Sequence, residues 1–193
     1  MKKYFGTDGI RGIPNKNLTK EIVSNVTCSV EDILKPTSVA VILDTRDSSL
    51  EILDWICEGF SENIEVINYG ILPSGSMPVL LGTFGHNLGI IISASHNPYQ
   101  DNGLKLFGAD GFKLNDEVEN EIQSRMINGP ILAKSENLGR ARRMEDAIGR
   151  YSEFVKQILP KREDLTSMKV VLDCYNGASY KVGPEVLFEL GAD

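Results

Sequence analysis

The chain has 193 residues, and its 20 lysines and arginines against 27 aspartates and glutamates give a formal net charge of −7. Hydrophobic residues at 41% and charged residues at 24% are typical of a globular protein and exclude disorder, collagen and coiled coil. The acidic balance argues against a general nucleic-acid or membrane binder, so a bound anion must meet a local basic site. No apolar run reaches membrane-span length, and the start MKKYFGTDGIRG lacks a signal peptide's apolar core, so the cytoplasm is the expected compartment.

The cysteines and histidines do not form a metal or disulfide pattern. Cys28, Cys57 and Cys174 are odd in number and far apart, and none belongs to a CxxC. We therefore expect buried or semi-buried thiols in a reducing compartment. The only histidines are His86 and His96, which argues against a histidine-based metal centre.

Short apolar runs and helical stripes alternate along the chain. The runs predict strands at 39–43, 64–69, 88–92, 103–107 and 168–172. The stripes, with apolar residues three or four apart, predict helices over 22–34, 52–60, 77–84, 118–126, 148–159 and 184–190. Thr19 and Asn115 are expected to cap helices, and Ser48 with Glu51 has the spacing of a capping box.

This element order predicts the domain organisation. Residues 1–145 are expected to form a three-layer α/β/α domain with a mixed sheet, and 146–168 a connecting helix and linker. The segment 169–193 holds one strand and one helix, less than the roughly 30 residues of a βαβ unit. Since one strand and one helix cannot bury their own apolar faces, the chain is expected to stop just inside a second, similar domain.

The sharpest motif is the segment 93–98, with sequence SASHNP, directly after the predicted strand 88–92. Ligand sites of open α/β sheets form at the carboxyl ends of such strands, although an ordinary turn has the same composition. Ser95 and His96 do not form a hydrolase pair, because adjacent residues on an extended segment point to opposite sides. The glycines of a nucleophile elbow are also missing around Ser95.

Three basic residues elsewhere in the sequence are candidates for the same site. Lys105 follows an Asn-Gly turn, and is either a surface lysine or a cation that returns to the Ser95 loop as phosphate ligand or acid/base. Arg11 ends the glycine-rich segment FGTDGIRG, which is not a Walker A loop, and it could grip a phosphate bidentately. Arg46, at a strand end, either orients the site or pairs with a neighbouring aspartate.

Four motifs resemble, in order, those of the α-D-phosphohexomutases: FGTDGIRG, LDTRDSS, SASHNPYQDNGLK and DCYNGASY. Within that family they look most like the bacterial phosphoglucosamine mutases, whose pattern GRYSEFVK also fits, and the resemblance covers essentially the whole chain. It implies an isomerase that moves a phosphoryl group between the 6- and 1-hydroxyls of a hexose phosphate. The implied reaction converts glucosamine 6-phosphate to glucosamine 1-phosphate, for UDP-N-acetylglucosamine and cell-wall synthesis.

The resemblance also implies roles for individual residues. Ser95 would carry the phosphoryl group, donate it to give a sugar bisphosphate and be rephosphorylated from the other end, with Mg²⁺ on the phosphoserine. Arg11 and Lys105 are expected beside the transferring group, Lys105 as an acid/base, with His96 lining the same loop. Arg46 is counted among the phosphate-binding residues. Such a site needs positioning and charge neutralisation more than a Ser-His dyad.

The sequence departs from the family at the metal site, because it contains no DGDxDR-type loop. The 193 residues alone are therefore expected to show little or no mutase activity, and Mg²⁺ is expected only with a full-length chain. Two alternatives stay open: a phosphomannomutase/phosphoglucomutase, and a non-catalytic fragment that binds a sugar phosphate or a partner. The expected partners are hexosamine phosphate and hexose bisphosphate; an exposed second-domain stub would invite association, which leaves a homodimer open.

Overall fold

The computed structural model describes residues 4–6, 8–129, 141–161 and 163–193. These residues form a six-stranded sheet in the order β1-β5-β4-β2-β3-β6. The strands are β1 (Ile10–Gly12), β2 (Ser38–Leu43), β3 (Glu65–Ile71), β4 (Leu88–Ile92), β5 (Asn102–Gly108) and β6 (Arg142–Arg143). The helices are α1 (Lys20–Leu34), α2 (Ser49–Gly59), α3 (Ser76–Phe84), α4 (Asp116–Asn128), α5 (Ala147–Lys156) and α6 (Val182–Glu189). No helix in the described residues is long and apolar enough to cross a membrane.

The sheet is mixed, as predicted. Strand β2 runs parallel to both β3 and β4, whereas β5 is antiparallel to β4 and to β1. Because β2, β3 and β4 are parallel, their carboxyl ends meet at one edge of the sheet. That edge carries the loop with Ser95.

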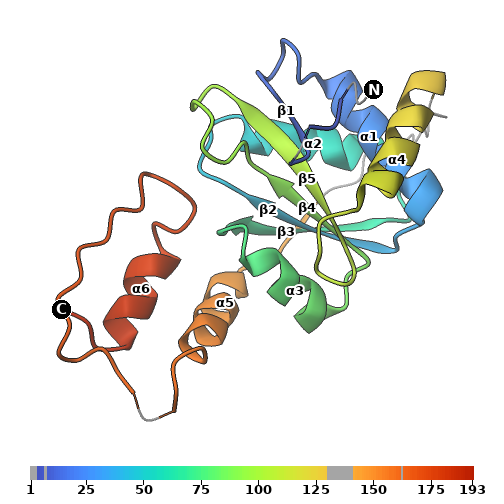
Figure 1. Cartoon of the computed structure of the whole chain (residues 1–193). Coiled ribbons are helices and arrows are strands. Elements are labelled where there is room, and N and C mark those ends of the chain that lie inside the picture. The colour runs from blue at the N-terminus through green and yellow to red at the C-terminus, as the bar shows by residue number, and fades with distance from the viewer. Residues whose placement is uncertain (1–3, 7, 130–140, 162) are drawn as a thin grey trace.

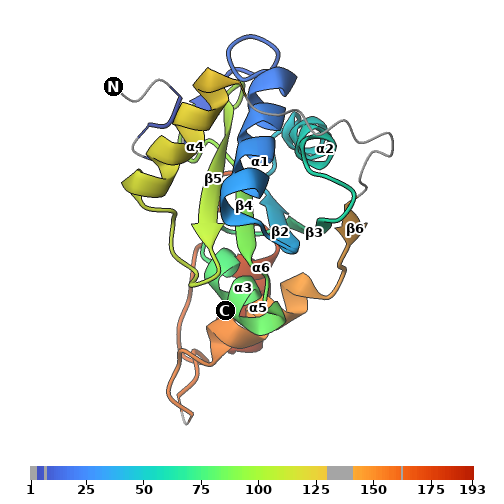
Figure 2. The ribbon, with the colours of Figure 1, turned by 90° about the vertical axis from the view of Figure 1, so that its right-hand side faces the viewer.

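Helices cover both faces of the sheet, which confirms the predicted three layers (Figures 1 and 2). Side chains alternate along β2. Val39 and Val41 pack in a core with α1, α2 and α4, while Ala40 and Ile42 pack in a second core with α3 and α5. Helix α6 lies outside α5, and Figure 1 shows it beyond α5 from the sheet.

The helix caps test the local predictions. Thr19 Oγ1 accepts a hydrogen bond from Ile22 N, and Asn115 Oδ1 accepts one from Val118 N, so both predicted caps are confirmed. The predicted capping box at the start of α2 is wrong. Ser48 is already helical there and makes no side-chain cap, because its hydroxyl accepts a hydrogen bond from a buried asparagine of β5 at 3.0 Å.

Two strands were not predicted, and one predicted strand does not form. The glycine-rich segment contributes β1, and Arg142–Arg143 forms the edge strand β6. Residues 168–172 are not a buried strand, since their backbone is irregular and Val171 is fully exposed. A strand needs a ladder of partners. Here Val170 N–H donates to Asp193 O, and no strand of the described chain lies beside the segment. The division of the chain at residues 145 and 168 stays a prediction.

Two of the three thiols are buried as expected. Cys28 and Cys57 are buried in the helix-covered core, Cys174 is half-buried, and no disulfide joins them in the described residues. Burial raises the pKa of the Cys57 thiol to about 11. Such a thiol stays protonated and unreactive at neutral pH.

A buried polar chain crosses the second core between β2, β3 and β4. Tyr69 Oη lies 2.6 Å from His86 Nε2, and His86 Nδ1 lies 3.1 Å from Ser38 Oγ. Burial is the main cause that lowers the pKa of His86, with Glu65 acting against it and Arg142 with it. The imidazole is therefore kept neutral inside the fold.

We expect this histidine to make the protein acid-sensitive. Below its ordinary pKa of 6.5, the unfolded chain protonates His86 but the folded chain does not until lower pH. The free energy of unfolding should therefore fall as the pH drops below that value, by up to about 1.4 kcal/mol per pH unit. Urea unfolding between about pH 7.5 and 5.5 measures this slope. His86→Gln should flatten it and the exposed His96→Gln should not; equal slopes in both variants would contradict the assignment.

Candidate functional site

The loop after β4 turns sharply at Ser95. Ser95 has a positive φ of 57°, which is uncommon for a residue with a side chain, and its N–H donates to Ser93 Oγ at 2.9 Å. Ala94 is fully buried, whereas Ser95 is exposed. Its hydroxyl makes no hydrogen bond within the described residues. The turn thus presents one serine hydroxyl to solvent at the carboxyl edge of the sheet.

Arg46 binds this loop from the end of β2. Its Nε donates to Asp44 Oδ2 at 2.8 Å, and the arginine side chain is only 9% exposed. Four backbone carbonyls of the loop accept hydrogen bonds from its two terminal nitrogens at 2.6–3.0 Å: Ser95, Asn97, Pro98 and Asp101. One side chain therefore fixes both sides of the turn.

The guanidinium of Arg46 has no donor left for a phosphate. An arginine has five N–H donors, and all five are used by Asp44 and the four carbonyls. The expectation that Arg46 binds phosphate stays a prediction, which would require some of these bonds to be exchanged. Both interpretations made from the sequence agree with these bonds, because Arg46 pairs with the neighbouring Asp44 and also holds the Ser95 loop.

Arg11 and Lys105 come together through an aspartate that the sequence analysis missed. Asp8 Oδ2 lies 2.7 Å from Arg11 Nη2 and 2.6 Å from Lys105 Nζ. The other terminal nitrogen of Arg11 donates to Asn97 Oδ1 at 2.8 Å, which ties this cluster to the Ser95 loop. Two cations that share one carboxylate are thus tied to the Ser95 loop through Asn97, whose amide nitrogen donates to Asp101 Oδ2.

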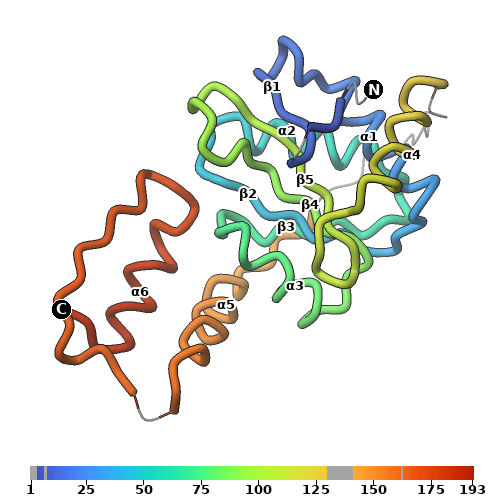
Figure 3. Tube along the Cα trace, in the orientation of Figure 1, coloured from blue at the N-terminus to red at the C-terminus, as the bar shows by residue number. Residues whose placement is uncertain are grey.

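The register of β1 and β5 explains why Asp8 and Lys105 lie close together. Ile10 lies opposite Leu104 and Arg11 opposite Gly103, so Lys105 is brought level with the turn that carries Asp8. Gly9 has a positive φ of 83°, and a Cβ there would meet the Leu104 carbonyl oxygen at 2.1 Å. The backbone approaches closely only because this residue is glycine. Figure 3 traces the blue N-terminal segment beside β5.

His96 lies in the Ser95 loop and Asn102 follows that loop, and only Asn102 differs from its sequence-based interpretation. His96 is exposed and makes no hydrogen bond or ion pair in the described part of the chain. Asn102 was taken only as part of a turn, yet it is fully buried and donates to Ser48 Oγ and Ser49 Oγ at 3.0 and 3.2 Å. This asparagine links β5 to the start of α2.

The pKa of Asp8 depends on its ion pairs with Lys105 and Arg11. Partial burial would raise the pKa of this carboxyl, but hydrogen bonds and charge from Lys105 and Arg11 outweigh it and hold the pKa below its usual range. We expect Lys105→Gln to raise the pKa of Asp8, measured by carbon NMR of the carboxyl. Lys16→Gln, an exposed lysine elsewhere, is the matched control. An unchanged Asp8 pKa in Lys105→Gln would contradict the ion pair.

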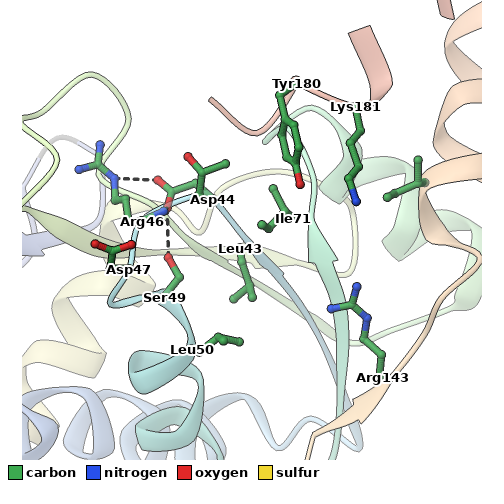
Figure 4. Close-up of a pocket in the computed structure, with 12 residues that line it drawn as sticks. Leu43, Asp44, Arg46, Asp47, Ser49, Leu50, Ile71, Arg143, Tyr180 and Lys181 are labelled. Carbon is green, nitrogen blue, oxygen red and sulfur yellow. Dashed lines mark hydrogen bonds and ion pairs between the residues drawn. The ribbon is translucent and has the colours of Figure 1, made fainter. Parts of the chain in front are cut away.

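The described residues contain no group of three or more histidine, cysteine, aspartate or glutamate side chains placed to hold a metal ion. Next to the Ser95 loop, however, lies an open pocket of about 390 Å³. It is lined from the ends of β2 and β3, from Arg143 and Ile148, and from Tyr180 and Lys181 at the start of α6. Figure 4 shows this pocket, with Arg46 and Ser49 both bonded to Asp44 at one side.

Comparisons with known proteins agree with this arrangement. Residues 2–130 match the family described as "Phosphoglucomutase/phosphomannomutase, alpha/beta/alpha domain I". Proteins named phosphoglucosamine mutase from Parvibaculum lavamentivorans and Methylobacterium nodulans are 46% and 45% identical over 100% of this chain, which covers 45% of each relative. A crystal structure from Thermus thermophilus, described as a "putative phosphomannomutase", has a TM-score of 0.80 at 21% identity. The match covers 97% of this chain and 43% of that one. The chain thus spans less than half the length of these relatives.

Proposed function

Because the chain belongs to the phosphoglucomutase/phosphomannomutase family, we propose that it carries the phosphoserine site of a hexose-phosphate mutase. Ser95 accepts and donates the phosphoryl group in this proposal. The observation that carries it is the exposed Ser95 hydroxyl on a braced turn, tied through Asn97 to the Arg11–Asp8–Lys105 cluster. The relatives named phosphoglucosamine mutase support glucosamine 6-phosphate and glucosamine 1-phosphate as the interconverted pair.

In the forward step, the Ser95 Oγ–P bond breaks as the new bond forms between phosphorus and a sugar hydroxyl oxygen. The sugar hydroxyl loses its proton, and a proton must reach Ser95 Oγ. Charge spreads over the three phosphoryl oxygens, so catalysis depends on fixed positive charge and alignment. Arg11 and Lys105 supply that charge, and Lys105, only 12% exposed, is the proposed acid/base. The sugar bisphosphate then reorients and returns its other phosphoryl group to Ser95.

In this proposal the phosphate on Ser95 is the only ligand that the described residues offer to Mg²⁺. Mg²⁺ takes six oxygen ligands and is usually bound by one or two carboxylates plus phosphate. The described residues have no carboxylate cluster for it, so Ser95, through its phosphate, is their single proposed ligand. None of the steps above is therefore assigned to a metal. The remaining ligands are expected only in a full-length chain, because these 193 residues contain no DGDxDR-type loop.

The wider role follows from the proposed product. Glucosamine 1-phosphate is a precursor of UDP-N-acetylglucosamine and hence of cell-wall peptidoglycan, which places the proposed reaction in the cytoplasm. The relatives are more than twice as long as this chain, so the complete reaction is proposed for a protein that includes it. A hexosamine phosphate and a hexose bisphosphate are the proposed small-molecule partners.

The test is whether Ser95 takes up phosphate. A protein that includes this chain is incubated with glucose 1,6-bisphosphate and Mg²⁺, and intact-mass analysis followed by peptide mapping locates any phosphoryl group. We expect one phosphoryl group, on Ser95, and none in Ser95→Ala. A serine that stays bare would favour the fragment that only binds sugar phosphate or a partner, and would overturn the proposal.

Substrate preference is tested separately. A protein that includes this chain is supplied with glucosamine, glucose and mannose 6-phosphates. We expect the largest kcat/KM for glucosamine 6-phosphate. A larger value for glucose or mannose phosphate would favour the phosphomannomutase/phosphoglucomutase alternative, whose names the structural neighbours carry.

A further inference from the structure

Asp8 is the member of the cationic cluster to which the proposed chemistry gives no role. Its Oδ2 atom lies 2.7 Å from Arg11 Nη2 and 2.6 Å from Lys105 Nζ, so both cations pair with the same oxygen. Carboxylate and phosphate oxygens accept the same charge-assisted hydrogen bonds from arginine and lysine. The carboxylate therefore takes up, between the two cations, donors that a phosphoryl oxygen would also bind.

Both cations keep further donors for an anion. Arg11 donates to Asp8 and to Asn97, which leaves three of its five N–H groups without an acceptor in the described residues. Lys105 has three N–H donors, and its one ion-pair partner in the described part of the chain is Asp8. In Arg46 all five donors are used. The donors that are open to an anion thus lie where Asp8 holds the two cations.

The carboxylate is the most exposed of the three charged groups. The side chain of Asp8 is 42% exposed, against 22% for Arg11 and 12% for Lys105. Its backbone is held in a tight turn, because Gly6 N–H donates to Gly9 O at 2.8 Å and β1 begins directly after that turn. The Asp8 carboxylate can therefore leave the cations for water by side-chain rotation alone, at the small cost typical of an exposed ion pair.

The two cations depend on this carboxylate while no phosphate is present. Asn97 holds Arg11 to the Ser95 loop but carries no charge. Without Asp8, the two like charges would repel, and Lys105 would be an almost buried ammonium group without a counter-ion. We expect it then to turn toward solvent and leave Arg11.

We propose that Asp8 is a positioning residue that holds Arg11 and Lys105 together while Ser95 is bare, and that phosphoryl oxygens replace its carboxylate during transfer. This inference rests on the proposed phosphoserine function. The exchange makes and breaks no covalent bond, and the displaced carboxylate is hydrated. Because Asp8 competes with the phosphoryl group, it also keeps the cations from binding that group too firmly before the reaction, which would slow transfer.

The first test is a titration with inorganic phosphate in the absence of Mg²⁺, followed by NMR of the Arg11 and Lys105 side chains. Asp8→Asn removes the competing charge but keeps the size of the side chain, and we expect phosphate to bind about fivefold more tightly or better. Asp146→Asn is the matched control, because it removes the same charge from an exposed ion pair with Arg150 at the start of α5. Its phosphate affinity should equal that of the wild type. Unchanged or weaker phosphate binding in Asp8→Asn would overturn the proposal.

The second test is kinetic and uses a protein that includes this chain. Asp8→Asn should lower KM for glucosamine 6-phosphate and also lower kcat, by about tenfold, because Lys105 loses its position. A residue that only stabilises the fold would not lower KM. Asp8→Glu keeps the carboxylate and should restore the wild-type KM and part of kcat.

The two tests separate this proposal from the proposed function. A wild-type protein whose Ser95 stays bare would overturn the phosphoserine function, and the phosphate titration would then decide the competition by Asp8 alone. A wild-type protein that is phosphorylated, with an unchanged kcat in Asp8→Asn, would overturn the positioning role only. The same conclusion would follow if Asp8→Glu behaved like Asp8→Asn.

Discussion

Replacement of Arg46 by alanine is expected to lower the free energy of unfolding by about 3–5 kcal/mol, the usual cost when one partner of a buried ion pair is removed. Asp44 would lose its cation, and the loop would lose hydrogen bonds to four carbonyls. The turn at Ser95 has a positive φ that must be held by its surroundings. Without the guanidinium, we expect the serine to move from its aligned position.

The same variant should slow phosphoryl uptake by Ser95 roughly a hundredfold, since a small misplacement of a reacting group costs about that much. Urea unfolding and the rate of Ser95 phosphorylation, both measured well below the unfolding temperature, separate stability from alignment. Arg46→Lys keeps the charge but not the five donors, and should recover only part of the rate. Arg150→Ala, in an exposed ion pair with Asp146, is the control. A wild-type rate in Arg46→Ala would show that the loop holds its shape unaided.

Gly9→Ala is expected to detach β1 from β5. The added Cβ would meet the Leu104 carbonyl oxygen at 2.1 Å, and the residue would also have to keep a φ of 83°. The atoms that the Cβ would meet belong to the backbone of Leu104 and Lys105, so they cannot move away without separating the two strands. We expect a loss of about 3 kcal/mol or more, from the left-handed conformation and the lost pairing together. Arg11 would move away from Lys105 with the strand.

Hydrogen exchange measures this outcome at the amides of β1 and β5. Protection should fall there in Gly9→Ala, and the free energy of unfolding should fall with it. Gly149→Ala is the matched control, because Gly149 lies in α5 and its new Cβ would meet nothing closer than 3.7 Å. That change should be neutral or stabilising by up to about 1 kcal/mol. Unchanged protection in Gly9→Ala would contradict this prediction, because it would show that the paired strands accommodate the added Cβ without loss of stability.

The layered core could be predicted because its signals are local. The run 88–92 is apolar throughout and is buried on both faces, and Asn115 caps its helix as its position indicates. The end segment 168–172 carries the same apolar signal but forms no strand. An apolar run forms a buried strand only where a neighbouring strand pairs with it. Whether such a strand lies beside it cannot be read from the run itself.

The site could be predicted in part, for a related reason. Residue chemistry made Ser95, Arg11 and Lys105 candidates and the family resemblance gave them roles. The structure brings the two cations together and ties them to the Ser95 loop. The aspartate between them was missed, although Asp8 stands three residues before Arg11, a spacing that allows an ion pair. The bonds of Arg46 to four loop carbonyls could not be predicted, because a sequence does not show which donors the fold uses.

The pairing of β1 with β5 also affects the order in which the protein assembles during synthesis. Ile10 leaves the ribosome about ninety residues before its partner Leu104, several seconds earlier at roughly 5–20 residues per second. For that time the segment with Asp8 and Arg11 has no strand to join. The earliest-made part of the site is thus among the last to take its place, and the nascent Ser95 loop emerges before its cations are fixed.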